Sequence, residues 1–343
     1  MRKKLCWSGV SANAGNTMAP ATDPADGDDL VQPFQIEGIG VRGRLARSGA
    51  LVTDILTRHD YPEPVSVLLG EALTLTAMFG SALKFDGRFT FQTQSDGPVG
   101  MLVADYVSPG RLRGYAHIDE ARLAGLMAQG RLKERPTSAE LLGEGFLAMT
   151  IDQGAKMERY QGIVALNPAG LTQSAHEYFE RSEQIATRIR LAVGPIYHRG
   201  EQGRGEVTWR AGAIMIQHVA RAGGITGMRE PDDERPPTDE EENWNRASIL
   251  LGSVEDHELL DPGLSAERLL YRLFHEDGVR AFEAAPLAFG CRCSRERTLN
   301  VVRSFDKAEI DGMVQNGEII VTCEFCNQSY KFDPRTVKEG MET

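Results

Sequence analysis

The residue types best suited to chemistry gather near the C-terminal end of the chain, where four of its five cysteines lie within 36 residues. They form a C-x-C pair, Cys291 and Cys293, and a C-x-x-C pair, Cys323 and Cys326. A tetrahedral thiolate site needs two such close pairs, each able to place two sulfurs ~2.3 Å from one ion. Thiolates favour zinc over hard cations, with an iron–sulfur cluster as the main alternative. The spacing therefore predicts one Zn²⁺ per chain.

The same spacing also suits redox chemistry. Two cysteines one residue apart would close a small, strained disulfide ring, and strained disulfides are commonly labile and regulatory. C-x-x-C is likewise found in redox motifs. Arg292, Arg295 and Arg297 surround the first pair, where positive charge would favour the thiolate, although these side chains could equally be solvated surface residues. The cluster is therefore a candidate for a metal site that responds to oxidants.

The small size of the terminal unit, from Cys291 to about Pro334, would make its folding depend on the metal. The unit is expected to contain a polar, Arg-rich first segment, a helix near 306–317 and a strand pair, 317–323 and 328–334, around Cys323 and Cys326. A unit of about 45 residues buries too little apolar surface to be stable alone. Structural zinc contributes ~10–16 kcal/mol of apparent folding free energy in small domains. Oxidation would replace that contribution with disulfides that close very short loops and constrain the chain little. The unit should then unfold, and apolar surface exposed nearby could bind other proteins.

The preceding region has the mixed pattern of an α+β domain. Residues 63–84 have helical periodicity, and 87–95 alternates apolar and polar residues as a half-buried strand does. Further strands are expected at 99–107, 111–118, 145–152, 159–166, 187–194 and 206–219, and a helix at 174–184. Runs of strands with a few separate helices predict an antiparallel sheet.

An acidic stretch separates this region from two short helices. Residues 229–245 contain eight acids and two arginines, and adjacent prolines exclude a helix through their middle. Helices are expected at 240–254 and 265–278, and Leu269, Leu270, Leu273 and Phe274 form an apolar stripe on the second. Such a pair cannot bury its apolar faces alone, so it must lie on the preceding or the following domain.

Composition and missing motifs exclude several classes of function. A net charge of −11 argues against a nucleic-acid binder. The longest apolar stretch is interrupted by Glu71, no secretory signal is evident, and the clustered, odd number of cysteines is not a secreted disulfide framework. These features predict a cytoplasmic protein without a membrane partner. The His-Glu dipeptides at His176, His257 and His275 lack the second histidine of H-E-x-x-H, so we interpret them as residues on helix surfaces. No phosphate-binding loop or G-x-S-x-G elbow occurs, so no enzyme is expected.

The motifs FGCRCSRER (289–297) and GEIIVTCEFCNQSYKFD (317–333) resemble those of the 33 kDa chaperonin family, the redox-regulated heat-shock holdases. EYFERSEQIATR (177–188) is similar to a signature of that family's core domain. The likeness covers residues from about 34 to 336. With the composition, it divides the chain into a disordered extension (1–29), an α+β core domain (30–227), an acidic connector with a metastable helical linker (228–288) and a zinc-binding redox-switch domain (289–343).

The resemblance also implies a mechanism. Cys291, Cys293, Cys323 and Cys326 would hold Zn²⁺ in a reduced, inactive state. Oxidation would pair Cys291 with Cys293 and Cys323 with Cys326 and release the metal. The linker would then unfold, and the protein would dimerise and hold unfolding client proteins without ATP.

Two features depart from the family pattern. They are the N-terminal extension, whose Cys6 we interpret as an incidental thiol, and the acidic connector at 229–242. We interpret the connector as a neutral insertion, the alternative being a segment that loosens the linker by self-repulsion.

Two other functions compete with the holdase. A thiol–disulfide oxidoreductase would place Cys323 and Cys326 in a thioredoxin-like βαβ context. A zinc module that recruits a partner would lose binding on oxidation, whereas a holdase would gain it.

Overall fold

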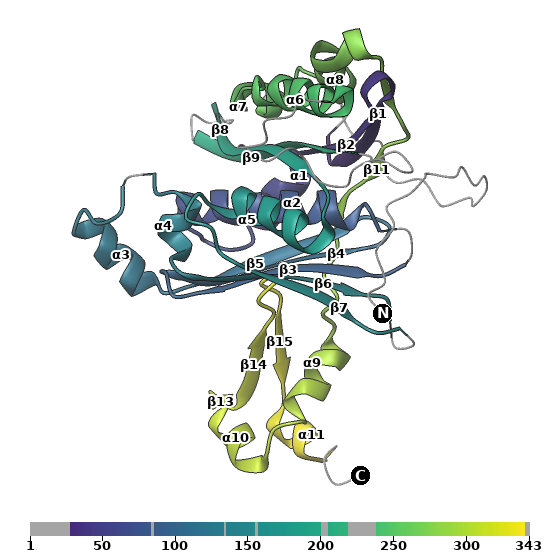
Figure 1. Ribbon diagram of the computed structural model, residues 1–343. Coiled ribbons are helices and arrows are strands. Elements are labelled where there is room, and N and C mark those ends of the chain that lie inside the picture. The colour runs from purple at the N-terminus through teal and green to yellow at the C-terminus, as the bar shows by residue number, and fades with distance from the viewer. Residues whose placement is uncertain are drawn as a thin grey trace.

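The computed structural model describes residues 28–83, 86–133, 135–154, 157–199, 205–218 and 238–339. Nearly all of the predicted N-terminal extension, with Cys6, and the connector up to residue 237 lie outside these ranges. The described residues form four layers above a small appended unit (Figure 1). From one side to the other, the layers are the linker helices, a first sheet, a layer of helices and a second sheet, from which the terminal unit projects (Figure 1).

The first sheet, sheet A, has the order β10-β1-β2-β9-β8, with β11 also paired to β1. Its centre is antiparallel, with β2 paired to β9 along its whole length and to β1 along all but its last residue. The strands are β1 (Leu30–Ile36), β2 (Val41–Ser48), β8 (Thr187–Arg199), β9 (Gly205–His218), β10 (Val279–Ala281) and β11 (Ala285–Pro286). Sheet A therefore joins the first described strands, β1 and β2, to strands from much later in the chain.

The second sheet, sheet B, has the order β12-β5-β4-β3-β6-β7. Its consecutive strands pair antiparallel, whereas the short edge strand β12 runs parallel to β5. The strands are β3 (Arg88–Ser95), β4 (Val99–Val107), β5 (Arg111–Ile118), β6 (Gly145–Asp152), β7 (Tyr160–Ala165) and β12 (Ala288–Phe289). The predicted strands of this region are thus confirmed, but the structure has two sheets where the sequence suggested one.

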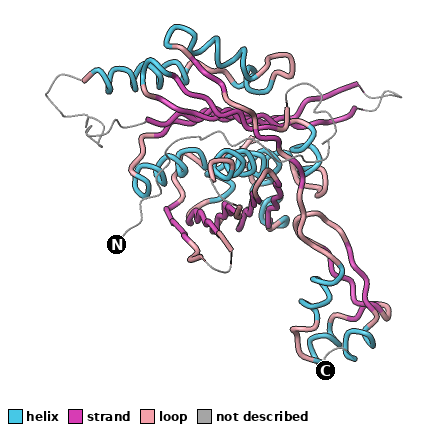
Figure 2. The backbone as a smooth tube through the Cα atoms, turned by 90° about the vertical axis from the view of Figure 1, so that its right-hand side faces the viewer, coloured by secondary structure: helices cyan, strands magenta, loops and turns pink. Residues whose placement is uncertain are grey.

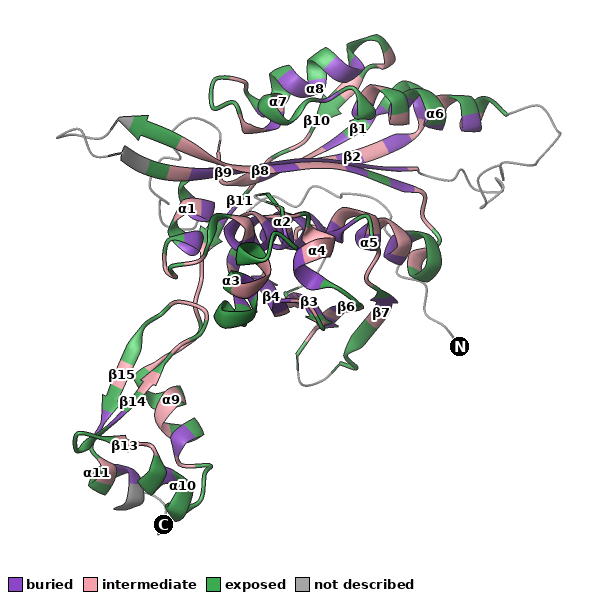
Figure 3. Cartoon of the chain, turned by 90° about the vertical axis from the view of Figure 1, so that its left-hand side faces the viewer, coloured by how far each residue is buried: buried purple, intermediate pink, exposed green. Residues whose placement is uncertain are grey.

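The helix α2 (Glu63–Gly80) forms the centre of the layer between the sheets. It is buried on nearly all sides (Figure 3), as expected for a helix that contacts strands of both sheets. A Cβ on Gly70 would lie 2.6 Å from Val193 of sheet A, and one on Gly80 would lie 2.3 Å from Tyr106 of sheet B. These two glycines therefore let α2 pack closely against both sheets.

Shorter helices complete the core. α1 (Ala50–Leu56) and α5 (Leu171–Tyr178) lie in the same layer as α2, and α5 continues as a π-helical turn at Phe179–Glu183. α3 (Glu120–Ala128) and α4 (Ser138–Leu142) lie at one end of sheet B (Figure 1). The predicted helix at 174–184 is confirmed as α5 with this turn.

The linker helices are α6 (Asp239–Gly252), α7 (Asp256–Leu260) and α8 (Ala266–Phe274), the last followed by a 3-10 turn at His275–Asp277. Thr238 caps α6, and its first turn carries four acids, Asp239 to Glu242, which the helix dipole stabilises. Leu269, Leu270, Leu273 and Phe274 are all buried. They pack with residues of sheet A in one apolar cluster, so the linker covers the core domain rather than the terminal unit.

The segment that follows the linker helices, residues 279–290, is here named the strap. It supplies β10 and β11 to sheet A and β12 to sheet B. Further backbone bonds fasten it, from Phe282 N to Pro33 O at 2.9 Å and from Gly290 N to Leu112 O at 3.0 Å. The strap therefore links both sheets immediately before Cys291.

The terminal unit has its own small core of Val302, Ile310, Ile319, Phe332 and Val337. Its elements are α9 (Arg295–Val302), α10 (Lys307–Gly312), β13 (Val314–Gln315), β14 (Glu318–Thr322), β15 (Ser329–Phe332) and α11 (Pro334–Glu339). The expected hairpin around Cys323 and Cys326 is confirmed as β14–β15, and the unit projects from one end of the molecule (Figure 2).

None of the helices in the described ranges is long and apolar enough to cross a bilayer. The predicted domain limits stay predictions.

Candidate metal centre

Two elements bring the four cysteines together. Cys291 and Cys293 follow β12 and precede α9, so their backbone leaves the edge of sheet B. Cys323 and Cys326 lie in the turn between β14 and β15, at the hairpin end nearest sheet B (Figure 1). That turn is closed by backbone bonds from Cys323 N to Gln328 O, at 3.0 Å, and from Asn327 N to Cys323 O, at 2.8 Å. The metal centre thus lies where the terminal unit meets the core domain.

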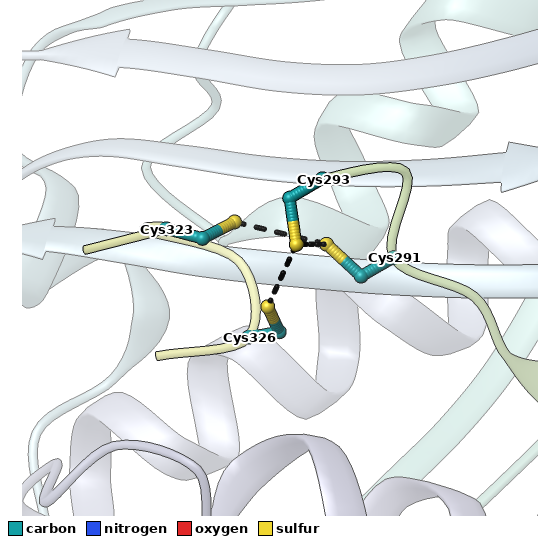
Figure 4. Close-up of side chains that lie close together, drawn as sticks. All are labelled: Cys291, Cys293, Cys323 and Cys326. Carbon is teal, nitrogen blue, oxygen red and sulfur yellow. Dashed lines mark hydrogen bonds between the residues drawn. The ribbon is translucent and has the colours of Figure 1, made fainter. Parts of the chain in front are cut away.

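All four side chains point toward one centre (Figure 4). The Sγ atoms lie within 4.8 Å of one another. Cys291 is 3.3 Å from Cys293 and 3.7 Å from Cys323, and Cys293 is 3.4 Å from Cys326. A tetrahedron with metal–sulfur bonds of ~2.3 Å has sulfur–sulfur edges of about 3.8 Å. The thiols are free, and their arrangement is close to that of four ligands around one ion.

Polar contacts favour the negative form of some of these sulfurs. Burial raises the pKa of Cys291, but hydrogen bonding with the backbone and side chain of Cys293, and with the other two thiols, outweighs it and lowers the pKa to about 7. Burial raises the pKa of Cys323 and Cys326. Tyr330 Oη donates to Cys293 Sγ at 3.2 Å. Cys291 therefore loses its proton more readily than Cys323 and Cys326 do.

The arginines near the first cysteine pair take part in local packing. Arg297 donates to the carbonyl of Arg292 at 2.7 Å, and the Arg295 guanidinium lies 4.8 Å from the ring centroid of Phe332. A cation from the core domain also reaches the sulfurs, because Arg113 Nη1 on β5 lies 4.0 Å from Cys291 Sγ. Arg113 precedes Cys291 by 178 residues, so no local sequence pattern could have indicated it.

Among the described residues, none of the His-Glu dipeptides belongs to a group of metal-ligand side chains. His176 is not the surface residue that we expected, because its Nε2 accepts a hydrogen bond from Ile189 N at 2.9 Å. His257 is exposed and lies 3.1 Å from Glu255. The C-x-x-C turn lies between antiparallel strands and not at a helix N-terminus, which argues against the oxidoreductase. Within the described ranges, the four cysteines are the group of metal-ligand side chains close enough to hold an ion.

Comparisons with known proteins agree with this architecture. The sequence model of the family described as Hsp33 protein matches residues 29–333. A 33 kDa chaperonin of Caulobacter vibrioides is 46% identical over 308 residues, which cover 90% of this chain and 95% of that protein. One from Pseudomonas syringae pv. syringae is 35% identical over 314 residues, covering 91% and 93% of the two chains. The crystal structure of a 33 kDa chaperonin from Thermotoga maritima has the same fold, with a TM-score of 0.69 and 21% identity over 92% of this chain and 98% of the other.

Proposed function

This chain belongs to the Hsp33 family of chaperones, and from that premise we propose that it is a redox-regulated holdase that works without ATP. In the proposed cycle the reduced, metal-bound form is inactive in the cytoplasm. Oxidation of the four cysteines activates it to dimerise and to bind unfolding client proteins. The observation that carries the proposal is the convergence of four free thiols at the junction of the terminal unit and the core domain.

Zinc is the metal that this donor set favours. Four sulfur donors with no oxygen or nitrogen ligand suit zinc rather than a hard cation, and the sulfur–sulfur distances of 3.3 to 3.7 Å suit a tetrahedron. Cys291, Cys293, Cys323 and Cys326 would hold the ion. Bound zinc would supply the folding free energy that the terminal unit lacks, because its core, as far as the unit is described, has only five buried apolar residues.

We propose that oxidation pairs Cys291 with Cys293 and Cys323 with Cys326. Each pair of thiolates gives up two electrons to hydrogen peroxide, which takes up two protons from solvent and becomes two water molecules, and a sulfur–sulfur bond forms. The distance between Cys291 and Cys293 supports the first pair, but Cys291–Cys323 and Cys293–Cys326 are almost as close. The pairing therefore rests on the family resemblance, and peptide mapping of the oxidised protein would test it.

The strap offers a route from the cysteines to the linker. It joins α8 to Cys291 and is held to both sheets by short strand pairings and by backbone bonds such as Ala288 N to Gly110 O at 2.9 Å. Unfolding of the terminal unit would remove the anchor at one end of the strap. Release of the linker helices would then expose the apolar residues beneath them, including Phe34, Leu45 and Ile214 of sheet A. We propose that this surface binds clients.

Light scattering tests the proposal. Reduced, zinc-loaded protein should leave the aggregation of a thermally unfolding enzyme unchanged, whereas protein treated with peroxide under mild heating should suppress it. Cys6→Ser should behave like the parent, because all four clustered cysteines remain, and Cys326→Ser should fail to switch. Equal protection by the reduced, zinc-loaded form would refute the redox switch, and loss of binding on oxidation would favour the recruitment module.

A further inference from the structure

The C-x-x-C turn is docked on the core domain by an aromatic side chain. Phe325, between the two cysteines, lies with its ring centroid 3.8 Å from the guanidinium carbon of Arg113 and 4.8 Å from the ring of Tyr115, edge to face. Both partners belong to β5 of sheet B. Asn327 Nδ2 also donates to the carbonyl of Arg58 at 2.9 Å. The turn that carries two of the four sulfurs is therefore held by the core.

Arg113 is itself fixed by a buried acid. Its Nε and Nη2 donate to Asp105 Oδ2 at 2.9 and 2.6 Å. Asp105 is 2% exposed and accepts a further bond from Thr90 Oγ1 at 2.6 Å. These bonds leave Nη1 directed at Cys291 Sγ, 4.0 Å away. One rigid guanidinium thus contacts both halves of the metal centre, stacking on the C-x-x-C turn and approaching the C-x-C pair.

We propose that Arg113 is a positioning residue for the metal site, supplied by the core domain. Four thiolates around a divalent ion leave two net negative charges, and a fixed cation beside them lowers the electrostatic cost of holding the sulfurs together. Contacts just outside the ligands typically change metal affinity by 10–100-fold. The inference rests on the proposed function, since it assumes that these cysteines hold zinc, and it adds that the core domain sets how tightly they do so.

The site is therefore shared between two domains. Zinc should bind less tightly when the docking of Phe325 on Arg113 and Tyr115 is weakened, even though every ligand remains. Peroxide should also release zinc sooner, because the two pairs would separate more readily.

The experiment measures the zinc affinity of the reduced full-length protein by competition with a chromophoric chelator. Arg113→Gln should weaken binding by about 10-fold, and Arg113→Lys, which keeps a cation beside Asp105, should recover part of the loss. Phe325→Leu removes the contact from the other side and leaves the buried Arg113–Asp105 pair intact, so it should also weaken binding. The matched control is Arg295→Gln, which removes a similar stacking contact, on Phe332, within the terminal unit and should change affinity less than twofold.

When Arg113→Gln and Phe325→Leu are combined, their effects on zinc affinity should be non-additive, because both break the same contact. The inference is wrong if Phe325→Leu binds zinc as the parent does, or if Arg295→Gln weakens binding as much as Arg113→Gln. Zinc affinity is measured without a client or an oxidant. A protein that fails to protect clients after oxidation while keeping this order of affinities would refute the holdase and leave the positioning role intact.

Discussion

Phe274 is the residue through which the docking of the linker can be tested most directly. It ends α8, is 0% exposed, and stacks on Phe34 of β1 with ring centroids 5.9 Å apart. Tyr271 lies one turn earlier on the same helix and is 65% exposed. Phe274→Ala and Tyr271→Ala therefore remove aromatic rings of similar size from the buried and the exposed face of one helix.

The expected difference is large. Truncating a buried phenylalanine to alanine costs about 3–5 kcal/mol, because apolar contacts are lost and a cavity remains. At 1.4 kcal/mol per factor of ten, the lower value raises the population of the undocked linker by about a hundredfold. Tyr271→Ala should change it by less than about threefold, since surface substitutions usually stay within about 0.5 kcal/mol.

Amide hydrogen exchange of the reduced, zinc-loaded protein measures this population. Peptides that cover α8 and the strap should exchange faster in Phe274→Ala, while those from β3 and β4, on the far side of the core, should keep their parental rates. The same variant should partly protect a client without oxidant. Unchanged exchange at α8 would refute the docked linker, and equal acceleration in β3 and β4 would mean that the substitution destabilises the whole core instead.

Other consequences can be checked separately. X-ray absorption of the reduced protein should show one zinc with four sulfur ligands; nitrogen or oxygen ligands would contradict the assignment. Burial, and then the charge of Arg188, lower the pKa of His176 to about 4. Because the unfolded chain takes up this proton near pH 6.5, the free energy of unfolding should fall as pH drops from 6.5 to 4, and His176→Gln should flatten that part of the urea-unfolding profile. Arg47 donates to the carbonyls of Leu264 and Asp261, so Arg47→Met should accelerate exchange in α8 without changing zinc content.

The sequence indicated the features that depend on local pattern. The four cysteines, the hairpin strands of sheet B and the amphipathic α8 are each visible within a short stretch of residues. Strands β1 and β2 of sheet A were not predicted from the sequence. β1 contains Pro33 and β2 alternates apolar residues with arginines, and both strands pair with partners far along the chain. The Arg-rich segment after Cys293, for which only a polar character is expected from the sequence, begins α9 behind an N-cap at Ser294.

The contact between Arg113 and Phe325 could not have been predicted by similar reasoning. Neither residue belongs to a motif that indicates a partner, and both are ordinary occupants of a strand and a turn. Only the antiparallel register of β4 and β5, which sets Asp105 opposite Arg113, and the parallel pairing of β12 bring them beside the cysteines.

The pairing of β1 with β10 has a consequence for synthesis on the ribosome. Phe34 faces Ala281 across the sheet, so the outer edge of β1 stays open until nearly 250 further residues have been translated. At roughly 5–20 residues per second, that edge waits about 12–50 s for its partner. A nascent chain of this protein is therefore itself an aggregation-prone polypeptide for much of its elongation, and its early strands would benefit from the kind of protection that the finished molecule is proposed to give.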